Sequence, residues 1–304
     1  MTTTSDNTPV PSPEPVIDRA IPPARVLMCA PTSYDVRYVI NPWMSLQNNP
    51  DIPRARRQWD SLYRTLAEDI GATVELIPQA SDCPDMVFTA NAGVVRGKSA
   101  LLARFRHPQR QPEEARFQAW FEEHGYRVET PPDGCNFEGE GDALFVGDTL
   151  VAGYLKRSDI TAHRWLSEQL FVPVLSVQLA DDRWYHLDTC LFALDSRTIA
   201  YFPAAFDEYA RRVLDSNFDT VIVSEEEALR FACNAVVIGR HVVLPAGCPD
   251  LTAQLQSRDF EAHAVEMSEF MKAGGACKCL TLFLEQQLHN YGAERGRDSR
   301  IDLL

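Results

Sequence analysis

Side chains that could act together in catalysis lie in four short segments of the chain. The segments are DMVFTANAG (residues 85–93), NFEGEGD (136–142), HLDT (186–189) and GGACKCLT (274–281). Together they supply carboxylates, an amide, an imidazole and thiols. Carboxylates can bind a planar guanidinium through paired hydrogen bonds, a thiolate can attack its carbon, and a histidine can protonate the departing ammonia. The set therefore fits nucleophilic chemistry on a guanidinium carbon.

None of these segments indicates that chemistry by itself. A single histidine is more often a structural hydrogen-bond donor, and Glu-Gly-Glu-Gly-Asp also fits an acidic turn in solvent. The sequence contains no G-x-S-x-G, no H-E-x-x-H and no complete G-x-G-x-x-G, so these familiar catalytic patterns offer no alternative. The catalytic interpretation depends on a fold that brings the four segments together.

A repeated pattern predicts such a fold. Four segments each contain two apolar, strand-like runs joined by a polar turn, and the turns lie 44 to 51 residues apart, at 96–97, 147–148, 195–196 and 239–240. Each hairpin is followed by a candidate helix and then by a single strand, so the unit is strand, strand, helix, strand. The predicted helices span residues 111–124, 158–170, 207–216 and 251–258. Recurrence at a nearly constant period indicates a repeat architecture.

A fifth unit can be assembled from the two ends of the chain. KCLTLFL near the C-terminus would supply one strand, and RVLMCAP, the helix at 53–71 and TVELIP would supply the rest. The ends would then meet and close an α/β ring of five ββαβ units, with the residues before each hairpin converging on one cavity. A plain open α/β sheet is the alternative.

The composition is that of a globular protein and excludes several functional classes. With 304 residues and a net charge of −14, the chain lacks the basic footprint that binding to nucleic acid or an anionic membrane requires. It contains no run of about 18 apolar residues that could span a membrane and no secretory signal, so we expect a cytoplasmic protein. We expect a disordered Pro-rich tail over residues 1–22, one catalytic domain over 23–290 and a charged tail over 291–304.

The eight cysteines are scattered along the chain, which is typical of free thiols in a reducing compartment. Cys277 and Cys279 form a close pair, but no second pair or nearby histidine completes a tetrahedral set. We therefore expect no metal site.

The ordered set of segments resembles a known superfamily. FTANAG, FEGEGD, HLDT and GGACKCLTL are similar to segments of the guanidino-group-modifying enzymes called penteins, which are five-bladed α/β propellers. These enzymes include arginine deiminase, dimethylarginine dimethylaminohydrolase and the amidinotransferases. FTANAG, NPWM (residues 41–44) and ARFRHPQRQPEE most resemble the arginine dihydrolases, and the resemblance extends from about residue 25 to 284. It implies a pseudo-symmetric pentein fold without a cofactor.

The resemblance also implies roles for individual residues. Cys279 matches the family's nucleophile, because a Cys followed two residues later by Ser or Thr is the family form, and Cys277 is its rival. His186 matches the general acid/base, with Asp188 two residues further on the same strand face.

Glu140 and Asp142 match the carboxylates that hold the guanidinium nitrogens, with Glu138 as the alternative to Glu140. Arg110 resembles the arginine that binds the substrate's α-carboxylate, although a surface charge at a helix start is the alternative. We also expect Asp85 to contact the substrate.

Asn91 occupies the position at which single-round relatives usually have a carboxylate. An amide offers both a donor and an acceptor, so it can hold arginine first and a citrulline-like intermediate afterwards. Asn41 would assist in the same way, or it is a turn residue before proline.

One departure from the family concerns a second carboxylate-binding arginine past the second hairpin. Thr161 stands at that position, and Arg157 or Arg164 is a candidate substitute.

The sequence therefore predicts a cysteine-dependent enzyme that converts arginine to ornithine, CO2 and two NH3 through a covalent thiouronium and a citrulline-like intermediate. The alternatives are a single-round deiminase or dimethylarginine dimethylaminohydrolase that releases citrulline, and a non-catalytic pentein that only binds. The expected partner is arginine or a substituted arginine, with neither nucleic acid nor membrane, and the chain could form a homo-oligomer.

Overall fold

A computed structural model describes residues 23–285 of the protein. The two predicted tails lie outside the described residues, as do residues 286–290, which the sequence analysis assigned to the catalytic domain. No helix within the described range is long and apolar enough to cross a membrane.

The described strands form five three-stranded sheets. In each sheet the first strand pairs antiparallel with the middle strand, and the middle strand pairs parallel with the third. Written in that order, the sheets are β15 (Leu282–Phe283), β1 (Arg25–Met28) and β2 (Thr73–Leu76); β3 (Gly93–Arg96), β4 (Ser99–Leu102) and β5 (Arg127–Glu129); β6 (Ala143–Val146), β7 (Thr149–Tyr154) and β8 (Val174–Gln178); β9 (Leu191–Ala193), β10 (Thr198–Tyr201) and β11 (Asp219–Ile222); and β12 (Val236–Ile238), β13 (His241–Pro245) and β14 (Glu261–Val265).

One long helix joins the middle and third strands of every sheet. These helices are α1 (Ile52–Arg64), α2 (Pro112–Glu123), α3 (Thr161–Leu170), α4 (Glu208–Asn217) and α6 (Pro249–Gln256). Two short helices, α5 (Glu225–Ala228) and α7 (Ser268–Met271), lie in connecting segments. All five predicted helices are present, with ends that differ by a few residues, and the strand, strand, helix, strand unit is confirmed.

Helix α1 illustrates how the sequence specifies these elements. The side chain of Asp51 caps its first turn by accepting a hydrogen bond from the Arg54 backbone N–H at 3.0 Å. Ala55, Trp59 and Leu62 recur at the spacing of one helix face and are buried, while the opposite face is polar. The helix therefore packs its apolar side inward and leaves its charged side in solvent.

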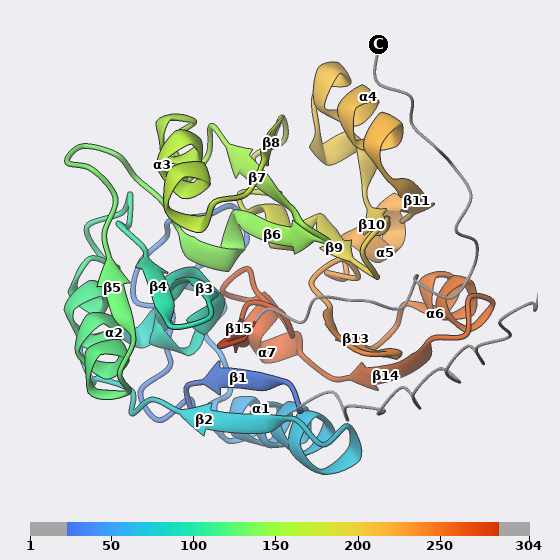
Figure 1. The fold of residues 1–304 in the computed structure, drawn as a ribbon. Coiled ribbons are helices and arrows are strands. Elements are labelled where there is room, and N and C mark those ends of the chain that lie inside the picture. Colours follow the sequence, from blue (N-terminus) through green and yellow to red (C-terminus); the bar gives the residue numbers. More distant parts are fainter. Residues whose placement is uncertain (1–22, 286–304) are drawn as a thin grey trace, which may run out of the picture.

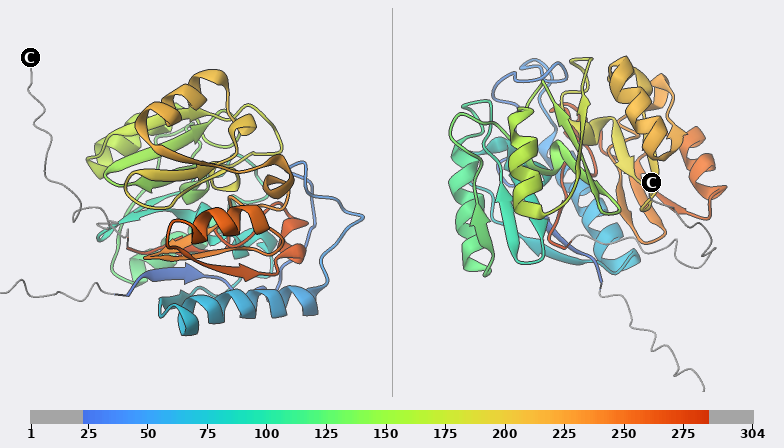
Figure 2. Two further views of the ribbon diagram at one scale, coloured as in Figure 1. Left: turned by 90° about the vertical axis from the view of Figure 1, so that its right-hand side faces the viewer. Right: turned by 45° about the horizontal axis from the view of Figure 1, so that its top comes forward.

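The five sheets close into a ring, and the two ends of the chain complete one blade. Strand β15 pairs with β1 through Val26 opposite Phe283 and Leu27 opposite Leu282. Figure 1 shows β15, β3, β6 and β9 near the middle and the long helices α1, α2, α3, α4 and α6 around the outside, an arrangement that the views in Figure 2 support. The predicted fifth unit is confirmed, and the open-sheet alternative is wrong.

Residues that precede the first strands meet at one end of the ring. Three hydrogen bonds join these loops between neighbouring blades: Ala90 N to Cys279 O at 3.1 Å, Leu187 N to Asp142 Oδ1 at 3.1 Å, and Asn234 Nδ2 to Asp188 O at 2.9 Å. Segments far apart in the sequence are thus held together by backbone and side-chain bonds, which is the convergence that the repeat predicted.

Candidate active site

The thiol of Cys279 lies in a buried polar environment just before β15. Its Sγ is 3.2 Å from Asp188 Oδ2 and 3.1 Å from Asn234 Nδ2, and its backbone N–H donates to Asn234 Oδ1 at 3.1 Å. Burial, and then the neighbouring Asp188, raise the pKa of Cys279 well above its usual range. Burial likewise raises the pKa of Asp188 to about 7, although Lys278 opposes this shift. Burial and the neighbouring Asp188 both favour the protonated form of the thiol.

Asn234 is a site residue that the sequence analysis missed. It precedes β12 by two residues, just as Asn91 precedes β3 by two residues. The repeat itself therefore carried a signal for this position. Asn234 contacts the side chain and backbone of Cys279 as well as the backbone of Asp188, so it fixes the geometry of the thiol.

Cys277, the rival nucleophile, is placed differently. Its side chain is fully buried in the apolar cluster that contains Val243 and Phe270, and its carbonyl accepts a hydrogen bond from Thr281 Oγ1 at 3.0 Å. Burial raises the pKa of its thiol above the usual range. The cavity beside Cys279 is lined by Cys279 and not by Cys277.

His186 pairs with Glu138 rather than with Glu140. His186 Nε2 lies 2.7 Å from Glu138 Oε2, and the same oxygen accepts from Arg157 Nη1 at 3.0 Å. Burial lowers the pKa of His186 to about 4, even though Glu138 acts in the opposite direction. Burial alone would raise the pKa of Glu138, but Arg157 and His186 outweigh it and hold that pKa below its usual range. A neutral imidazole therefore donates from Nε2 to a carboxylate and leaves Nδ1 as an acceptor.

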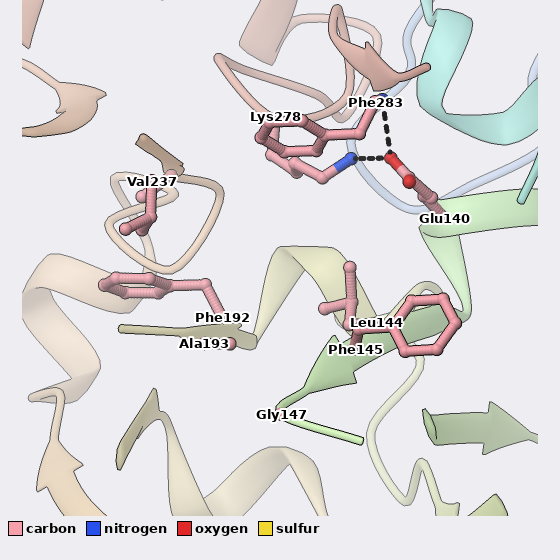
Figure 3. Close-up of a pocket in the computed structure, with 10 residues that line it drawn as sticks. Glu140, Leu144, Phe145, Gly147, Phe192, Ala193, Val237, Lys278 and Phe283 are labelled. Carbon is pink, nitrogen blue, oxygen red and sulfur yellow. Dashed lines mark hydrogen bonds and ion pairs between the residues drawn. The ribbon is translucent and has the colours of Figure 1, made fainter. Parts of the chain in front are cut away.

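Glu140, which we expected at the guanidinium, contacts other groups in the structure. Its Oε2 accepts from Lys278 Nζ at 2.8 Å and from the Phe283 backbone N–H at 3.1 Å, as Figure 3 shows. It lines a separate pocket, together with Leu144, Phe192 and Val237. The alternative residue, Glu138, takes the place beside His186.

A backbone turn separates the two glutamates. Gly139 adopts φ = +61°, and a Cβ there would lie 2.6 Å from Ala90 O, so only glycine fits. The chain then forms a 3-10 turn over Gly139–Gly141 instead of a strand. Side chains at 138 and 140 therefore do not share one face, as strand alternation would require.

Asp142 also has a structural position. It accepts from Ser158 Oγ at 2.6 Å and from the Leu187 backbone N–H at 3.1 Å. Burial raises the pKa of Asp142 to about 8, and Glu138 and Asp188 add to this shift. Asp142 thus supports the segment that carries His186, and these contacts favour a positioning role over the predicted contact with the guanidinium.

Arg110 and Asn91 form a buried pair on the wall of the cavity. Arg110 Nη1 donates to Asn91 Oδ1 at 2.6 Å, and Glu113 holds the other side of the guanidinium through two bonds of 2.9 and 2.8 Å. Arg110 is 3% exposed, so its alternative role as a surface charge does not fit. Asp85 lies beside this pair, and its Oδ2 accepts from Tyr38 OH at 3.0 Å. Burial raises the pKa of Asp85.

Of the remaining predicted residues, Arg157 and Asn41 line the cavity and Arg164 does not. Arg157 is 3% exposed, whereas Arg164 lies at the surface and pairs with Glu168. Asn41 also lines the cavity, but its side chain bonds to the backbone: Nδ2 donates to Ala273 O at 3.0 Å, and Oδ1 accepts from the Trp43 N–H at 2.9 Å. The position of Asn41 thus favours the turn role.

The cavity lies beside Cys279, Asn91 and Arg110. Its polar lining consists of Asn41, Asp85, Asn91, Arg110, Arg157, Tyr185 and Cys279. Eight buried side-chain atoms have no hydrogen-bond partner among the described residues, and four of them belong to predicted site residues: Asp85 Oδ1, Asn91 Nδ2, His186 Nδ1 and Asp188 Oδ1. Buried polar atoms are rarely left unpaired, so this concentration marks a place for a polar ligand.

Comparison with known proteins agrees with this geometry. Residues 34–285 match a family model described as N,N dimethylarginine dimethylhydrolase, eukaryotic. The bifunctional arginine dihydrolase/ornithine cyclodeaminase ArgZ of Synechocystis sp. is 44% identical over 264 residues, which cover 85% of this chain and 37% of that protein. The N(G),N(G)-dimethylarginine dimethylaminohydrolase of Mycobacterium tuberculosis is 42% identical over 259 residues, which cover 85% of this chain and 85% of that protein. The chain thus spans just over a third of the length of ArgZ and most of the length of the mycobacterial enzyme.

Solved structures show the same relationship. The N-terminal domain of ArgZ, an arginine dihydrolase from cyanobacteria, superposes with a TM-score of 0.84 at 42% identity, over 87% of this chain and 99% of that domain. It was solved as a cysteine-to-serine variant bound to substrate, and an asparagine-to-serine variant was solved covalently bound to a reaction intermediate. With five closed ββαβ blades and a match to the family model over 252 residues from 34 to 285, the chain belongs to the dimethylarginine dimethylaminohydrolase family of the guanidino-group-modifying pentein superfamily.

Proposed function

We propose that the protein is a cysteine-dependent arginine dihydrolase, which converts arginine to ornithine, CO2 and two NH3. The proposal is supported by the similarity to ArgZ and by the groups that surround Cys279. Arginine carries a carboxylate, an ammonium and a guanidinium, and the cavity offers a counterpart for each of them.

Two arginines suit the α-carboxylate. Arg157 uses Nη1 for Glu138 and Nη2 for the Ile40 carbonyl at 2.8 Å, which leaves further N–H donors for a ligand. Arg110 uses four of its five N–H groups within the described residues. The free Asp85 Oδ1 suits the α-ammonium group, and the free Asp188 Oδ1 draws the guanidinium towards Cys279 Sγ.

The first round begins when the guanidinium cation reaches the protonated thiol. A cation beside Asp188 and Cys279 favours the thiolate, since it offsets the burial that holds the thiol neutral. Sulfur then bonds to the guanidinium carbon while the thiol proton passes through His186 Nδ1 to one nitrogen, which leaves as ammonia. Water gives one proton to His186 Nδ1 and attacks the thiouronium carbon. Cleavage of the C–S bond leaves a thiolate, which takes that proton back from His186. The second proton of the water passes to the released ammonia, so a neutral ureido group remains.

The second round repeats these steps on the ureido carbon. Sulfur attacks, a second ammonia leaves, and water releases a carbamic acid that decomposes to ornithine and CO2. The ureido group differs from the guanidinium in presenting an oxygen, so the site must donate a hydrogen bond where it had accepted one.

The proposal of two rounds rather than one is supported mainly by the free amide donor of Asn91. Arg110 occupies Asn91 Oδ1, and Asn91 Nδ2 has no partner among the described residues. A Cβ at Gly141 would lie 2.3 Å from Asn91 Nδ2 and 3.2 Å from His186 Cγ, so this donor lies beside the acid/base residue. A carboxylate at position 91 would offer no donor to a ureido oxygen.

A single-round reaction that releases citrulline is the second candidate, because the family model and the mycobacterial relative both carry the name of a dimethylarginine hydrolase. A non-catalytic binding role is disfavoured by the buried thiol at the cavity and by the buried imidazole that lies beside Asn91. The test is to incubate the purified, EDTA-treated protein with arginine and, separately, with dimethylarginine. Two ammonia and one ornithine per arginine support the proposal, whereas one ammonia with citrulline, or turnover of dimethylarginine alone, contradicts it.

Location and assembly remain predictions. All eight cysteines are free thiols. This suits a reducing cytoplasm, where disulfides are rare. Size-exclusion chromatography with light scattering tests for a homo-oligomer.

A further inference from the structure

Two histidines and a glutamate form a cluster at the far end of the fifth blade. His241 begins β13, and Glu261 and His263 lie on β14, which is the edge strand of the sheet. His241 is in register with Glu261 and Val243 with His263, so all three side chains project from one face. The cluster follows the hairpin turn at Gly239, whereas Asn234 and the catalytic residues precede the first strands. It is therefore separate from the Cys279 cavity.

The atoms of this cluster are spaced as ligands of one ion would be. His241 Nδ1 lies 3.0 Å from His263 Nε2 and 3.3 Å from Glu261 Oε2, and His263 Nε2 lies 3.7 Å from Glu261 Oε1. Atoms that each lie about 2.1 Å from a common centre are about 3.0 Å apart in octahedral and about 3.4 Å apart in tetrahedral geometry. One ligand atom from each residue lies within 4.8 Å of the others.

Hydrogen bonding alone satisfies this cluster poorly. A neutral His241 has at most one hydrogen on Nδ1, and both a nitrogen and a carboxylate oxygen lie near that atom. A cation between the three groups satisfies both ring lone pairs and the carboxylate together.

We propose that His241, Glu261 and His263 bind a divalent transition-metal ion of the zinc, nickel or cobalt class. Two imidazoles and one carboxylate favour these ions over magnesium and calcium, which prefer oxygen ligands. Glu261 is 65% exposed, so water can complete the coordination. Because the ligands come from neighbouring strands, the ion would fasten the edge strand β14 to β13.

The metal would stabilise the fifth blade and would take no part in catalysis. The catalytic steps use a thiol, an imidazole and carboxylates, so the proposal leaves the reaction independent of metal. Loading the site should raise the melting temperature, since an ion that binds the folded chain stabilises it by mass action. Removing the ion should leave the rate of arginine turnover unchanged.

The experiment titrates the EDTA-stripped and dialysed full chain with Ni2+ by calorimetry and with Co2+ by absorption spectroscopy. We expect one equivalent, a rise in melting temperature and no thiolate-to-cobalt band, which would report binding at a cysteine. His241→Ala and His263→Ala should abolish this binding, and Glu261→Gln should weaken it about tenfold or more. His124→Ala is the matched control, because His124 is an exposed histidine stacked on Trp120 outside the cluster.

Three results would overturn the proposal: no binding to the parent protein, binding retained in both histidine variants, or a thiolate band that disappears in Cys279→Ser. Arginine turnover and the apo melting temperature report whether each variant is folded. If His263→Ala unfolds, His263→Gln keeps a polar side chain of similar length without an imidazole and replaces it in the series.

Discussion

Glu138 contacts both the imidazole of His186 and the guanidinium of Arg157, and Arg157 lines the Cys279 cavity. Its Oε2 lies 2.7 Å from His186 Nε2 and 3.0 Å from Arg157 Nη1. The carboxylate therefore sets the tautomer of the imidazole and fixes an arginine that lines the cavity. Under the proposed function, this one buried side chain would connect the proton-transferring imidazole with an arginine suited to the substrate carboxylate.

Replacing Glu138 tests this assignment. Glu138→Gln removes the charge that orients His186, so we expect kcat to fall by about 10²-fold or more. Glu140→Gln is the control, because Glu140 pairs with Lys278 in another cavity, and its kcat should stay within about tenfold of the parent value. Steady-state kinetics with arginine provides the measurement. A larger loss in Glu140→Gln than in Glu138→Gln would restore the original assignment from the sequence.

The two cysteines near the C-terminus make a second matched pair. Cys279→Ala should reduce turnover by orders of magnitude while arginine binding stays measurable by calorimetry, because Asp85, Arg110 and Arg157 remain. Cys277→Ala should retain near-parental kcat and lose only about 1 kcal/mol of stability, since it shortens a packed side chain. The reverse pattern would show that Cys277 is the nucleophile.

The sequence predicted the fold well because its pattern of apolar and polar residues repeats from blade to blade. Hairpins and amphipathic helices recur in each blade, so errors in one element are corrected by the others, and pairing of β15 with β1 follows from the incomplete units at the two ends. The side chains at the centre obey no such period. Glu138 and Glu140 could not be told apart, because the turn at Gly139 has no counterpart in a strand pattern. The role of Arg157 depends on a contact with Glu138 that sequence spacing does not reveal.

Breaking the buried ion pair of Lys278 and Glu140 should destabilise the protein, because it leaves one buried charged group without its partner. Both side chains are almost fully buried, and Lys278 Nζ also donates to the Thr281 carbonyl at 2.9 Å. Lys278→Met removes the ammonium group from a buried carboxylate and should lower the free energy of unfolding by about 3–5 kcal/mol. Urea denaturation of Lys278→Met, Glu140→Gln and the double variant measures the coupling. Losses that simply add in the double variant would show that the pair does not act as a unit.

Asp142 should make stability depend on pH. Its pKa is raised by burial to about 8, so the folded state holds this proton more tightly than the unfolded chain does. The stability that it contributes is therefore complete below about pH 4 and is lost as pH rises towards 8. Asp142→Asn cannot titrate, so the parent should lose a few kcal/mol relative to this variant between pH 5 and pH 8.5. Asp188 titrates in both proteins, so its effect largely cancels in the comparison. A difference in urea midpoint that does not change with pH would mean that Asp142 is ionised throughout this pH range.

We expect Asn91 to decide whether the citrulline-like intermediate is kept or released. Arg110 Nη1 lies 2.6 Å from Asn91 Oδ1, which orients the free Nδ2 towards the space beside His186 and Gly141. Asn91→Asp preserves the shape and strengthens the contact with Arg110, but it replaces the donor by a second acceptor. That oxygen would repel the ureido oxygen, so the product should shift from ornithine to citrulline and ammonia per arginine should fall from two to about one. Asn91→Ser is the comparison, because its hydroxyl can still donate, and it should release less citrulline than Asn91→Asp. If Asn91→Asp still makes two ammonia per arginine near the parental rate, the second round does not depend on this amide.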